Sequence, residues 1–485
     1  MKLLLASSEV HPYSKTGGLA DMVGALAKAL AQSGQQVAVV TPLYRGIIEK
    51  FPDIHPLDWR LDLPLGVRQV QAQAWKRDWP PDLTVYFIHQ PAFYDRAGLY
   101  QENGVDYPDN AERFIFFSKC VVYLARHLAL QPDLVHVHDW QVGLAPLMIA
   151  HGNRHEGWGS APKTCLTIHN LAYQGLFPAE AYGFTNLPAD YFSPEGVEFY
   201  GSLNCLKAAI SFADILTTVS PRYAREILTE PFGCGLDGVL RQRQNSLVGI
   251  LNGVDYSEWK TTDNPFLKDS FSIRSPRGKE IEKLELQREL GLPATTTVPL
   301  FGNISRLVDQ KGSDILLGAL EEMLAANLQF VQLGSGDPFF ERALVNLARR
   351  HPAKVAVRIG YDHALSHRIE AGCDFYLMPS RYEPCGLNQM YSLRYGTIPI
   401  VRATGGLDDS IVDPTEDLES ANGIKFHDYS ARALAKAMRK ALVLYADPKL
   451  VRRFRKNAMA ADFSWDRTTD EYLKVYQRAL SAAGG

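Results

Sequence analysis

Short apolar runs rich in β-branched residues alternate with longer segments of helical spacing along the first half of this chain. The runs fall at residues 2–6, 37–40, 83–88, 134–137, 164–168 and 214–219. This alternation is typical of βαβ units, in which parallel strands are buried by helices on both faces of the sheet. The first half therefore predicts a doubly wound α/β domain.

The same alternation restarts after a polar, charged stretch at 263–289. Its apolar runs fall at 298–304, 328–333, 355–359, 374–378, 397–401 and 423–426. A chain of 485 residues is also longer than one hydrophobic core usually extends. We therefore expect two doubly wound α/β domains, residues 1–247 and 248–462, that face a central cleft.

The last segment of the chain, residues 463–485, has the pattern of one amphipathic helix. Trp465, Tyr472, Leu473, Tyr476 and Leu480 recur at helical intervals in it. We expect this helix to pack back on the N-terminal domain.

Composition narrows the class of protein without identifying it. The hydrophobic content of 46% and charged content of 22% are those of a globular protein, and a net charge of −3 gives no electrostatic reason to expect nucleic acid or a membrane surface as partner. The six cysteines stand singly with no CxxC pair, which argues against disulfides and cysteine-rich zinc sites. Glu9 and His11 interrupt any signal-peptide core, and no apolar run reaches the length of a membrane span, so we expect a cytoplasmic protein.

The segment from Ser380 to Ile411 carries the most informative chemistry. Glu383 follows an apolar strand that Pro379 ends, and helical spacing begins after Gly386. Open parallel sheets bind ligands at the carboxyl ends of their strands, and the first turn of a helix attracts phosphate. This segment therefore predicts a site for an anionic leaving group, with Gly405 and Gly406 after the next strand.

Two further segments predict phosphate contacts. Lys15, Gly17 and Gly18 follow the first strand and precede a helix, although the Walker pattern GxxxxGK[ST] is absent. Arg306 follows a strand and Lys311 precedes a helix, and such cations bind phosphate by a bidentate fork or as a point charge. The alternative for the first segment is a plain glycine-rich turn with a solvated Lys15. The alternative for Lys311 is a surface ion pair.

Glycines close two other strands of the second half, at Gly334 with Gly336 and at Gly360, which Tyr361 follows. Glycine at these positions is consistent with backbone that approaches a ligand closely.

Two strands of the first half end in residues suited to a sugar. Asp139 and Trp140 offer a carboxylate for hydroxyl groups and an apolar ring face. His169 and Asn170 stand just past the next strand, where His169 can donate to a hydroxyl, although a lone histidine there is more often structural.

Metal chemistry is not predicted. His136 and His138 share a strand face but lack convincing third and fourth ligands, and at least one of them is expected to be satisfied by backbone. His363 and His367 are four residues apart without the HExxH pattern. No Asp-x-Asp triplet occurs, so neither metal nor cofactor is expected and cationic groups must neutralise a leaving group.

Taken together, these motifs resemble those of bacterial glycogen synthases and plant starch synthases, retaining transferases with two Rossmann-like domains of the GT-B type. The resemblance extends from the first strand to Phe463, through KTGGLADMVGAL, HDWQ, TIHNLAYQG, NGVDYSEW, SRLVDQKG and PSRYEPCGLNQMYSLRYGTIPIVRATGGLDD. It implies transfer of glucose from ADP-glucose to the non-reducing end of an α-1,4-glucan with retention of configuration and release of ADP. The N-terminal domain is then the acceptor side and the C-terminal domain the nucleotide-sugar side.

The resemblance also implies roles for single residues. Lys15, Arg306 and Lys311 form the diphosphate clamp, Glu383 lies beside the transferred sugar, and His169 is a partner at that sugar. The remaining substrate-side residues that it implies are Asn252, Asp139, Trp140, Asp21, Gly386, Leu387, Gly406 and, on a family motif, Lys283, with Cys385 as a packing or pocket-wall residue. The chain departs from the family pattern at Gln141 and Asp408, which leaves the acceptor preference open.

Retention through a covalent intermediate needs a second carboxylate, and none stands convincingly opposite Glu383. The resemblance implies instead a front-face substitution in which the departing diphosphate helps deprotonate the acceptor. Two alternatives stay open: a GT-B transferase with another nucleotide sugar or acceptor, such as a sucrose-forming enzyme, and a glucan-binding protein without activity. No feature of the sequence predicts an oligomeric state.

Overall fold

The computed structural model describes residues 1–79, 82–155, 157–158 and 161–481, and its chain divides into two compact units. Unit 1 comprises residues 1–219, 224–253 and 465–485, and unit 2 comprises residues 220–223 and 254–464. The chain leaves unit 1 after Gly253, whereas the sequence places the boundary at residues 247 and 248. No helix in the described part of the chain is long and apolar enough to cross a membrane.

Unit 1 is built on a sheet that has nine strands among the described residues, in the order β14-β13-β9-β8-β1-β2-β5-β4-β3. The seven strands from β14 to β5 are parallel. They are β1 (Lys2–Ala6), β2 (Gln36–Pro42), β5 (Leu83–His89), β8 (Leu134–His138), β9 (Lys163–Ile168), β13 (Ile215–Thr218) and β14 (Leu247–Gly249). All six apolar runs of the first half are strands of this sheet, as predicted.

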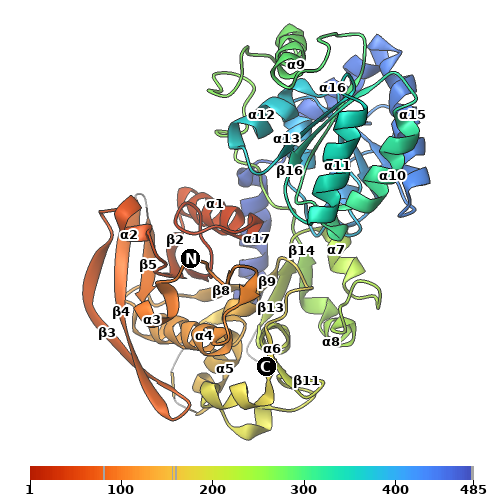
Figure 1. The fold of residues 1–485 in the computed structure, drawn as a ribbon. Helices are drawn as coiled ribbons and strands as arrows, with labels where there is room; N and C mark the ends of the chain where they lie inside the picture. Colours follow the sequence, from red (N-terminus) through yellow and green to blue (C-terminus); the bar gives the residue numbers. More distant parts are fainter. Residues whose placement is uncertain (80–81, 156, 159–160, 482–485) are drawn as a thin grey trace. The chain divides into compact units, whose positions relative to one another are not determined.

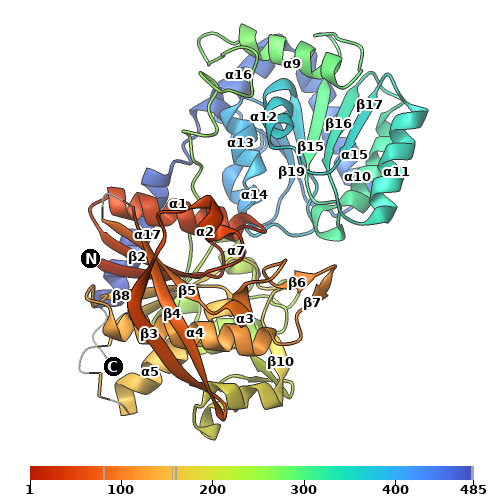
Figure 2. The same ribbon diagram turned by 60° about the vertical axis from the view of Figure 1, so that its left-hand side comes forward.

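Helices cover both faces of this sheet (Figures 1 and 2). The helices α1 (Gly18–Gln32) and α17 (Trp465–Ser481) pack together on one face, while α4 (Asn110–His127), α5 (Ala145–His155) and α6 (Cys205–Phe212) pack in succession on the other. Tyr472 and Tyr476 of α17 are completely buried, and the Tyr476 hydroxyl lies 2.8 Å from His136 Nδ1. The C-terminal helix is therefore part of the core of unit 1.

The antiparallel strands β3 (His55–Leu65) and β4 (Arg68–Trp79) are absent from the sequence prediction. Exposed positions alternate with more buried ones along β3, which is the edge strand, and β4 beside it is mostly partly buried or exposed. Such strands carry too many polar residues to stand out as apolar runs.

Short elements complete unit 1 and the crossing into unit 2. They are α2 (Ile47–Lys50), α3 (Pro91–Tyr94), β6 (Gln101–Glu102), β7 (Val105–Asp106), β10 (Leu176–Pro178), β11 (Glu198–Phe199), β12 (Ser202–Asn204), α7 (Pro221–Glu226) and α8 (Asp237–Gln242).

Unit 2 is built on a parallel sheet that has six strands among the described residues, in the order β17-β16-β15-β18-β19-β20. The strands are β15 (Leu300–Ile304), β16 (Gln329–Gly334), β17 (Val355–Ile359), β18 (Phe375–Met378), β19 (Ile398–Arg402) and β20 (Ile424–Phe426). Each lies on an apolar run of the second half, so the predicted fold class, α/β with two doubly wound sheets, is confirmed.

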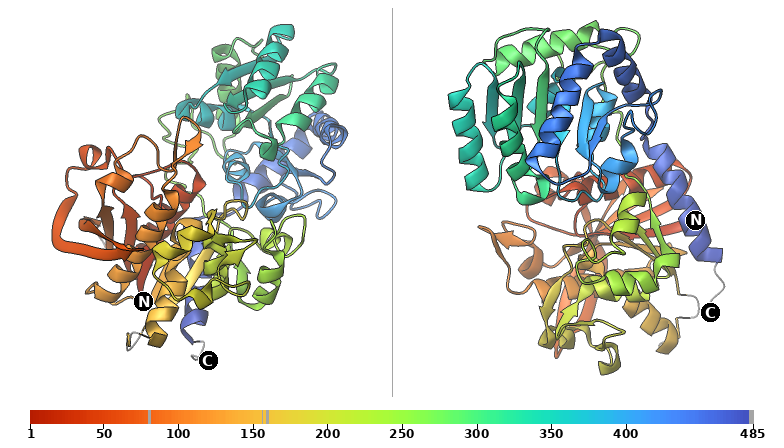
Figure 3. Two further views of the ribbon diagram at one scale, coloured as in Figure 1. Left: turned by 60° about the horizontal axis from the view of Figure 1, so that its bottom comes forward. Right: turned by 90° about the vertical axis from the view of Figure 1, so that its right-hand side faces the viewer.

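Helices cover both faces of this sheet as well (Figure 3). The helices α10 (Ser313–Met323), α11 (Pro338–Arg350) and α15 (Ala431–Tyr445) pack on one face, around Phe301 and Phe330. The helices α9 (Arg277–Glu289) and α12 (His363–Gly372) pack on the other, around Leu300 and Val331. Alternate strand residues thus serve opposite cores. The remaining helices are α13 (Asn388–Arg394), α14 (Gly405–Ser410) and α16 (Pro448–Ala460).

The winding direction reverses once in each parallel sheet. In unit 1 the reversal lies between β1 and β8, and in unit 2 it lies between β15 and β18. The connections after these strands diverge to opposite sides, and doubly wound sheets bind ligands at this point, beyond the carboxyl ends of the strands. The loops after these four strands are therefore the first place to look for a site.

Candidate active site

The reversal in unit 2 brings Lys311 and Glu383 together. Lys311 lies in the loop after β15 and Glu383 in the loop after β18, and Lys311 Nζ is 2.6 Å from Glu383 Oε2. Ser380 Oγ donates a second hydrogen bond to the same oxygen at 2.9 Å. The Glu383 side chain is only 6% exposed, whereas that of Lys311 is 21% exposed. The carboxylate is therefore fixed in place, and the ammonium group borders the solvent.

Glycines allow these loops to approach each other closely. Gly312 has a φ of 74°, and a Cβ there would lie 2.0 Å from the Pro379 carbonyl oxygen. Gly405 has a φ of 46°, and a Cβ there would lie 1.9 Å from the carbonyl oxygen of Glu383. A side chain at either position would displace the backbone that carries Lys311 or Glu383.

The other predicted residues of this region form the walls around Glu383. The Gly406 N–H is directed at the carbonyl oxygens of Glu383 and Pro384, both at 3.1 Å, so it is used within the protein. Leu387 caps α13 without a side-chain hydrogen bond, Gly386 has a φ of 72°, and Cys385 is buried and forms no disulfide.

Arg306 and Tyr361 remain accessible near the strand ends of unit 2. The Arg306 side chain is exposed, and among the described residues it makes one hydrogen bond, to Gln310 Oε1 at 3.4 Å, and no ion pair. Tyr361 follows β17 and Gly360 and is 83% exposed. The guanidinium group is thus available to an anion, and the phenol ring to a flat group.

At the reversal point of unit 1 lies a buried carboxylate that the sequence analysis did not predict. Glu9 follows β1 and is 3% exposed. It accepts hydrogen bonds from Thr16 Oγ1 at 2.6 Å, Tyr100 Oη at 2.7 Å and the Gly17 N–H at 3.4 Å. The Gly17 N–H, which was expected to face a phosphate, is therefore directed at Glu9. A carboxylate three residues after a strand that ends in LLLA was the available sign of this role.

Lys15 and Asp21 form an ion pair at the surface of unit 1. Lys15 Nζ is 2.7 Å from Asp21 Oδ2, and the two side chains are 46% and 33% exposed. Gly18, the second residue of the glycine pair, begins α1. Exposed pairs of this kind are weak, so an anion of higher charge can compete for Lys15.

Asp139 and His169 lie side by side at the ends of β8 and β9. Asp139 Oδ1 accepts a hydrogen bond from the backbone N–H of His169 at 2.8 Å, and burial raises the pKa of Asp139 to about 7. The Trp140 ring is packed by the edges of Phe114 and Phe177, with centroids at 5.0 Å and 5.6 Å. The carboxylate and the indole are thus held rigidly at the strand ends.

A chain of three histidines continues from this point into the core. His138 Nδ1 lies 3.1 Å from His169 Nε2, and the nitrogens of His136 lie 2.8 Å from Tyr476 Oη and 2.6 Å from Thr167 Oγ1. Burial lowers the pKa of His136 and of His169 to about 3, and that of His138 well below its usual range. All three are neutral near pH 7, and His138, which the sequence prediction did not assign, fixes the orientation of His169.

Two asparagines complete the polar residues of unit 1. Asn170 Oδ1 accepts the Ala172 N–H at 3.1 Å, which leaves its amide NH₂ for other acceptors. Asn252 follows β14 and is 7% exposed, and its Oδ1 has no hydrogen-bond partner among the described residues. Buried carbonyl oxygens are rarely left without a donor, so this atom is suited to a ligand hydroxyl.

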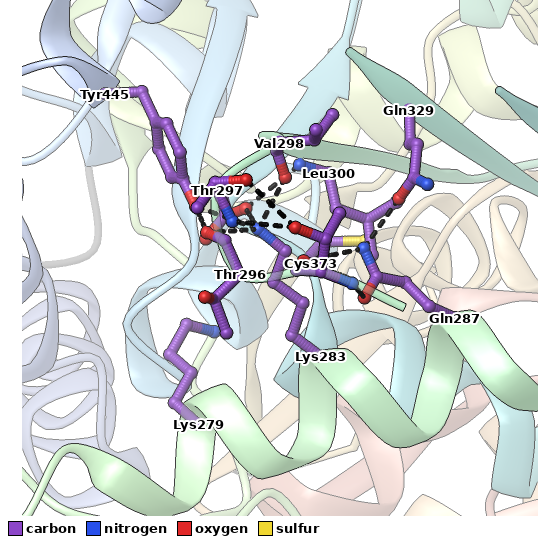
Figure 4. Close-up of polar contacts among 12 residues, drawn as sticks. Lys279, Lys283, Gln287, Thr296, Thr297, Val298, Leu300, Gln329, Cys373 and Tyr445 are labelled. Carbon is purple, nitrogen blue, oxygen red and sulfur yellow. Dashed lines mark hydrogen bonds and ion pairs between the residues drawn. The ribbon is translucent and has the colours of Figure 1, made fainter. Parts of the chain in front are cut away.

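The placement of Lys283 argues for a role other than substrate binding. It lies on α9, is 3% exposed, and its Nζ lies 2.6 Å from Asp374 Oδ2. It also donates to the Val298 carbonyl oxygen at 2.6 Å and to Tyr445 Oη at 2.8 Å (Figure 4). These contacts occupy its three donors, so in this structure Lys283 joins α9 to the core of unit 2 and is not available to a phosphate.

Comparison with known proteins defines the class of the chain. Residues 2–242 match the family described as starch synthase catalytic domain, and residues 287–460 match glycosyl transferases group 1. Two doubly wound units with polar and cationic residues at their reversal points, joined to these matches, define a glycosyltransferase of the GT-B fold.

Full-length relatives identify the family. The chain is 45% identical to a glycogen synthase of Anaeromyxobacter dehalogenans over 98% of its length and 99% of the relative's. It is 47% identical to a glycogen synthase of Anaeromyxobacter sp. strain Fw109-5, over 99% and 100% of the two chains. The chain belongs to the glycogen and starch synthase family.

Solved structures agree with this family. The catalytic domain of starch synthase IV from Arabidopsis thaliana, bound to ADP and acarbose, matches with a TM-score of 0.89 and 33% identity over 99% of both chains. A sucrose-phosphate synthase from Thermosynechococcus elongatus matches with a TM-score of 0.61 and 18% identity over 99% of both chains, a likeness of fold alone.

Replacing Lys283 by Met tests its structural role. We expect Lys283→Met to lower the free energy of unfolding of unit 2 by on the order of 3 kcal/mol, because it removes one partner of a buried ion pair. The KM for the nucleotide sugar should stay unchanged. Chemical denaturation and steady-state kinetics measure both, with Lys436→Met on the exposed face of α15 as control. A raised KM at unchanged stability would return Lys283 to the substrate site.

The buried histidines predict acid sensitivity of unit 1. The folded-state pKa of His136 is about 3 against an ordinary value near 6.5. The folded state therefore binds fewer protons, so this stability is present above about pH 6.5 and is lost as the pH falls towards 3. We expect His136→Gln to make the unfolding free energy less pH-dependent by up to about 1.4 kcal/mol per pH unit in that window.

Urea unfolding of unit 1 at several pH values measures this slope. The exposed His55 supplies the control, because His55→Gln should leave the slope as it is in the unmodified chain. The same slope for the unmodified chain and His136→Gln would contradict the assignment.

Proposed function

We propose that this chain transfers glucose from ADP-glucose to the non-reducing end of an α-1,4-glucan with retention of configuration, and releases ADP. The observation that carries the proposal is the Lys311–Glu383 pair at the reversal point of unit 2, a cation and a carboxylate 2.6 Å apart. Full-length similarity to glycogen synthases supports the substrate class, and the Arabidopsis structure with ADP supports the nucleotide.

The leaving group is a nucleoside diphosphate, and its departure must be assisted by positive charge. Arg306 is exposed and has no ion pair among the described residues, and Lys311 borders the solvent. Arginine binds phosphate oxygens in bidentate fashion and lysine adds a point charge. We assign these two residues, with Lys15 of unit 1, to the diphosphate.

Glu383 is suited to stabilise the positive charge that develops on the sugar. When Lys311 binds a phosphate, Glu383 keeps its hydrogen bond from Ser380 and remains next to the reacting carbon as an anion. A fixed carboxylate stabilises an oxocarbenium-like sugar without reorganising. Among the candidate residues of unit 2 no second carboxylate is available as a nucleophile, so we favour front-face substitution, in which the leaving phosphate accepts the proton of the acceptor hydroxyl.

Unit 1 supplies neutral hydrogen-bonding groups that suit sugar hydroxyls. His169 is uncharged near pH 7 because burial lowers its pKa to about 3, and His138 engages its Nε2. Asn252 offers an unpartnered carbonyl oxygen, and Asp139 and Trp140 are rigidly held. We assign His169 and Asn252 to the transferred glucose, and Asp139, Trp140 and Asp21 to the acceptor.

The cysteines fit a reducing compartment. The six cysteines, all within the described residues, form no disulfide, and only Cys234 is exposed. Disulfides are rare in the cytosol, where reductants keep thiols reduced, so we propose that the protein acts in the cytoplasm.

Product analysis tests the proposed reaction. The purified chain is incubated with ADP-glucose or UDP-glucose, with and without a maltooligosaccharide, and nucleotide release, product length and linkage are followed. We expect ADP release to depend on the acceptor and the glucan to lengthen through α-1,4 bonds. Release of UDP with a sucrose-type product would favour the other transferase, and glucan binding without nucleotide release would favour a binding protein.

The diphosphate clamp predicts the effect of removing either cation of unit 2. We expect Arg306→Ala and Lys311→Ala each to lose about 1.5–3 kcal/mol of transition-state stabilisation, or roughly ten- to a hundredfold in kcat/KM, because a charge-assisted hydrogen bond is lost. Lys436→Ala, on an exposed helix face, is the control. Near-normal kcat/KM in both variants would refute the clamp.

The carboxylate predicts a larger effect on turnover. We expect Glu383→Ala to lower kcat at least about a hundredfold, the scale of a removed electrostatic stabiliser. The exposed Glu280 of α9 provides the control variant Glu280→Ala. Circular dichroism establishes that the variants are folded, and full turnover of folded Glu383→Ala would exclude this residue from the chemistry.

A further inference from the structure

Unit 2 contains a cluster of metal-ligating side chains that the proposed reaction does not use. One potential ligand atom from each of Glu258, His363 and His367 lies within 4.8 Å of the other two. His363 and His367 are one turn apart at the start of α12, and Glu258 reaches them from the segment after Val254. Over a hundred residues separate this glutamate from the histidines, so the sequence pattern did not reveal the group.

His367 is held in one orientation by its neighbours. Its ring stacks on Trp259 with centroids 4.1 Å apart and 14° between planes, and Trp259 stacks in turn on Tyr391 at 3.7 Å and 6°. His367 Nδ1 lies 2.9 Å from Tyr395 Oη, and Asn264 Nδ2 lies 2.9 Å from the same Oη and 3.4 Å from Nδ1. In the tautomer that binds a metal, Nδ1–H donates to Tyr395 Oη and the lone pair of the ring is on Nε2. Metal-binding histidines are oriented in this way by a hydrogen bond from the other nitrogen.

The Nε2 atom of His367 provides a second, independent reason to expect a ligand at this cluster. His367 is completely buried, and Nε2 has no hydrogen-bond partner among the described residues. A buried nitrogen without a partner costs free energy unless a ligand satisfies it.

His363 and Glu258 are the partly exposed members of the cluster. His363 Nε2 is 3.4 Å from Glu258 Oε1, and the two side chains are 40% and 44% exposed. Both can therefore adjust to a bound ion, while His367 is fixed. One rigid and two adaptable ligands give an entry path for a cation from the solvent.

We propose that Glu258, His363 and His367 bind one divalent d-block cation, of which Zn²⁺ is the best match. Two imidazoles and one carboxylate suit zinc, whereas Mg²⁺ and Ca²⁺ prefer oxygen ligands. Three protein ligands leave a fourth tetrahedral position for water. The bound ion joins the segment around Trp259 to α12, and it thereby stabilises unit 2.

This inference is separate from the proposed transferase activity. None of the three ligands belongs to the residues that we assign to the diphosphate, the glucose or the acceptor. Tyr361, whose hydroxyl lies 3.4 Å from His363 Nδ1, follows Gly360 at a strand end where the sequence indicates close approach to a ligand. Binding is therefore measured directly and not through activity.

Metal titration of the full chain tests the site. After treatment with a chelator and its removal, the chain is titrated with ZnCl₂ in a calorimeter, and with CoCl₂ while the d–d absorption of Co²⁺ is followed. We expect one ion per chain, a tetrahedral cobalt spectrum and a higher unfolding temperature of unit 2 with zinc. MgCl₂ should produce none of these changes.

Substitutions locate the binding. His363→Ala and Glu258→Gln alter partly exposed side chains and should each weaken zinc binding at least about tenfold, the smallest loss usual even for outer-shell partners. Glu258→Gln keeps the size of the side chain, so it remains informative if His363→Ala folds poorly. His151→Ala is the matched control, because His151 and His155 form another pair four residues apart, with ring centroids at 4.7 Å.

The outcomes separate cleanly. Stoichiometric binding that both cluster variants weaken and the control does not would establish the site. Zinc binding that is equal in the unmodified chain and in both cluster variants, or the absence of stoichiometric binding, would overturn the proposal.

Discussion

Parallel winding is the constraint on which the sites of both units depend. A parallel sheet presents the carboxyl ends of all its strands at one edge, and the loops diverge only where the winding reverses. In unit 2 this point lies between β15 and β18, and Lys311 and Glu383 meet there. The helices and the apolar faces of the strands form the hydrophobic core. Charged residues therefore lie in the loops, whose backbone is held in place by the strand that precedes each loop.

The two units hold their polar groups in different electrostatic states, and burial is the reason. The residues at the strand ends of unit 2 are cations near solvent around one paired carboxylate. Those of unit 1 are buried imidazoles that stay neutral and a carboxyl, Asp139, whose pKa is raised to about 7. Charges near solvent suit a diphosphate, whereas neutral hydrogen-bonding groups suit sugar hydroxyls. The division of substrates that we propose follows this difference.

Apolar runs predicted the parallel strands well because those strands are buried on both faces. The same reasoning could not find β3 and β4, whose exposed positions are polar. Residues that follow the strands were predicted to lie near one another, because a parallel sheet places the carboxyl ends of its strands at one edge. The buried pair of Lys283 on α9 with Asp374, 91 residues away in sequence, could not be predicted from the motif that indicated a substrate contact. The role of His138 was missed for a similar reason, because its partner His169 lies 31 residues away. Glu9 was missed although Thr16 and Gly17, two of its partners, are close in sequence.

The Lys311–Glu383 contact also bears on how the reaction begins. Without substrate the ammonium group neutralises a carboxylate that is almost fully buried, and an unpaired charge at that position would be costly. A diphosphate carries more negative charge than one carboxylate, so it can draw Lys311 towards itself. In the reaction that we propose, Glu383 then keeps its hydrogen bond from Ser380, and its charge is neutralised again as positive charge forms on the sugar. On this proposal, binding of the leaving group prepares the carboxylate for the transition state, and phosphate contacts away from the reacting carbon offset the free energy of separating the pair.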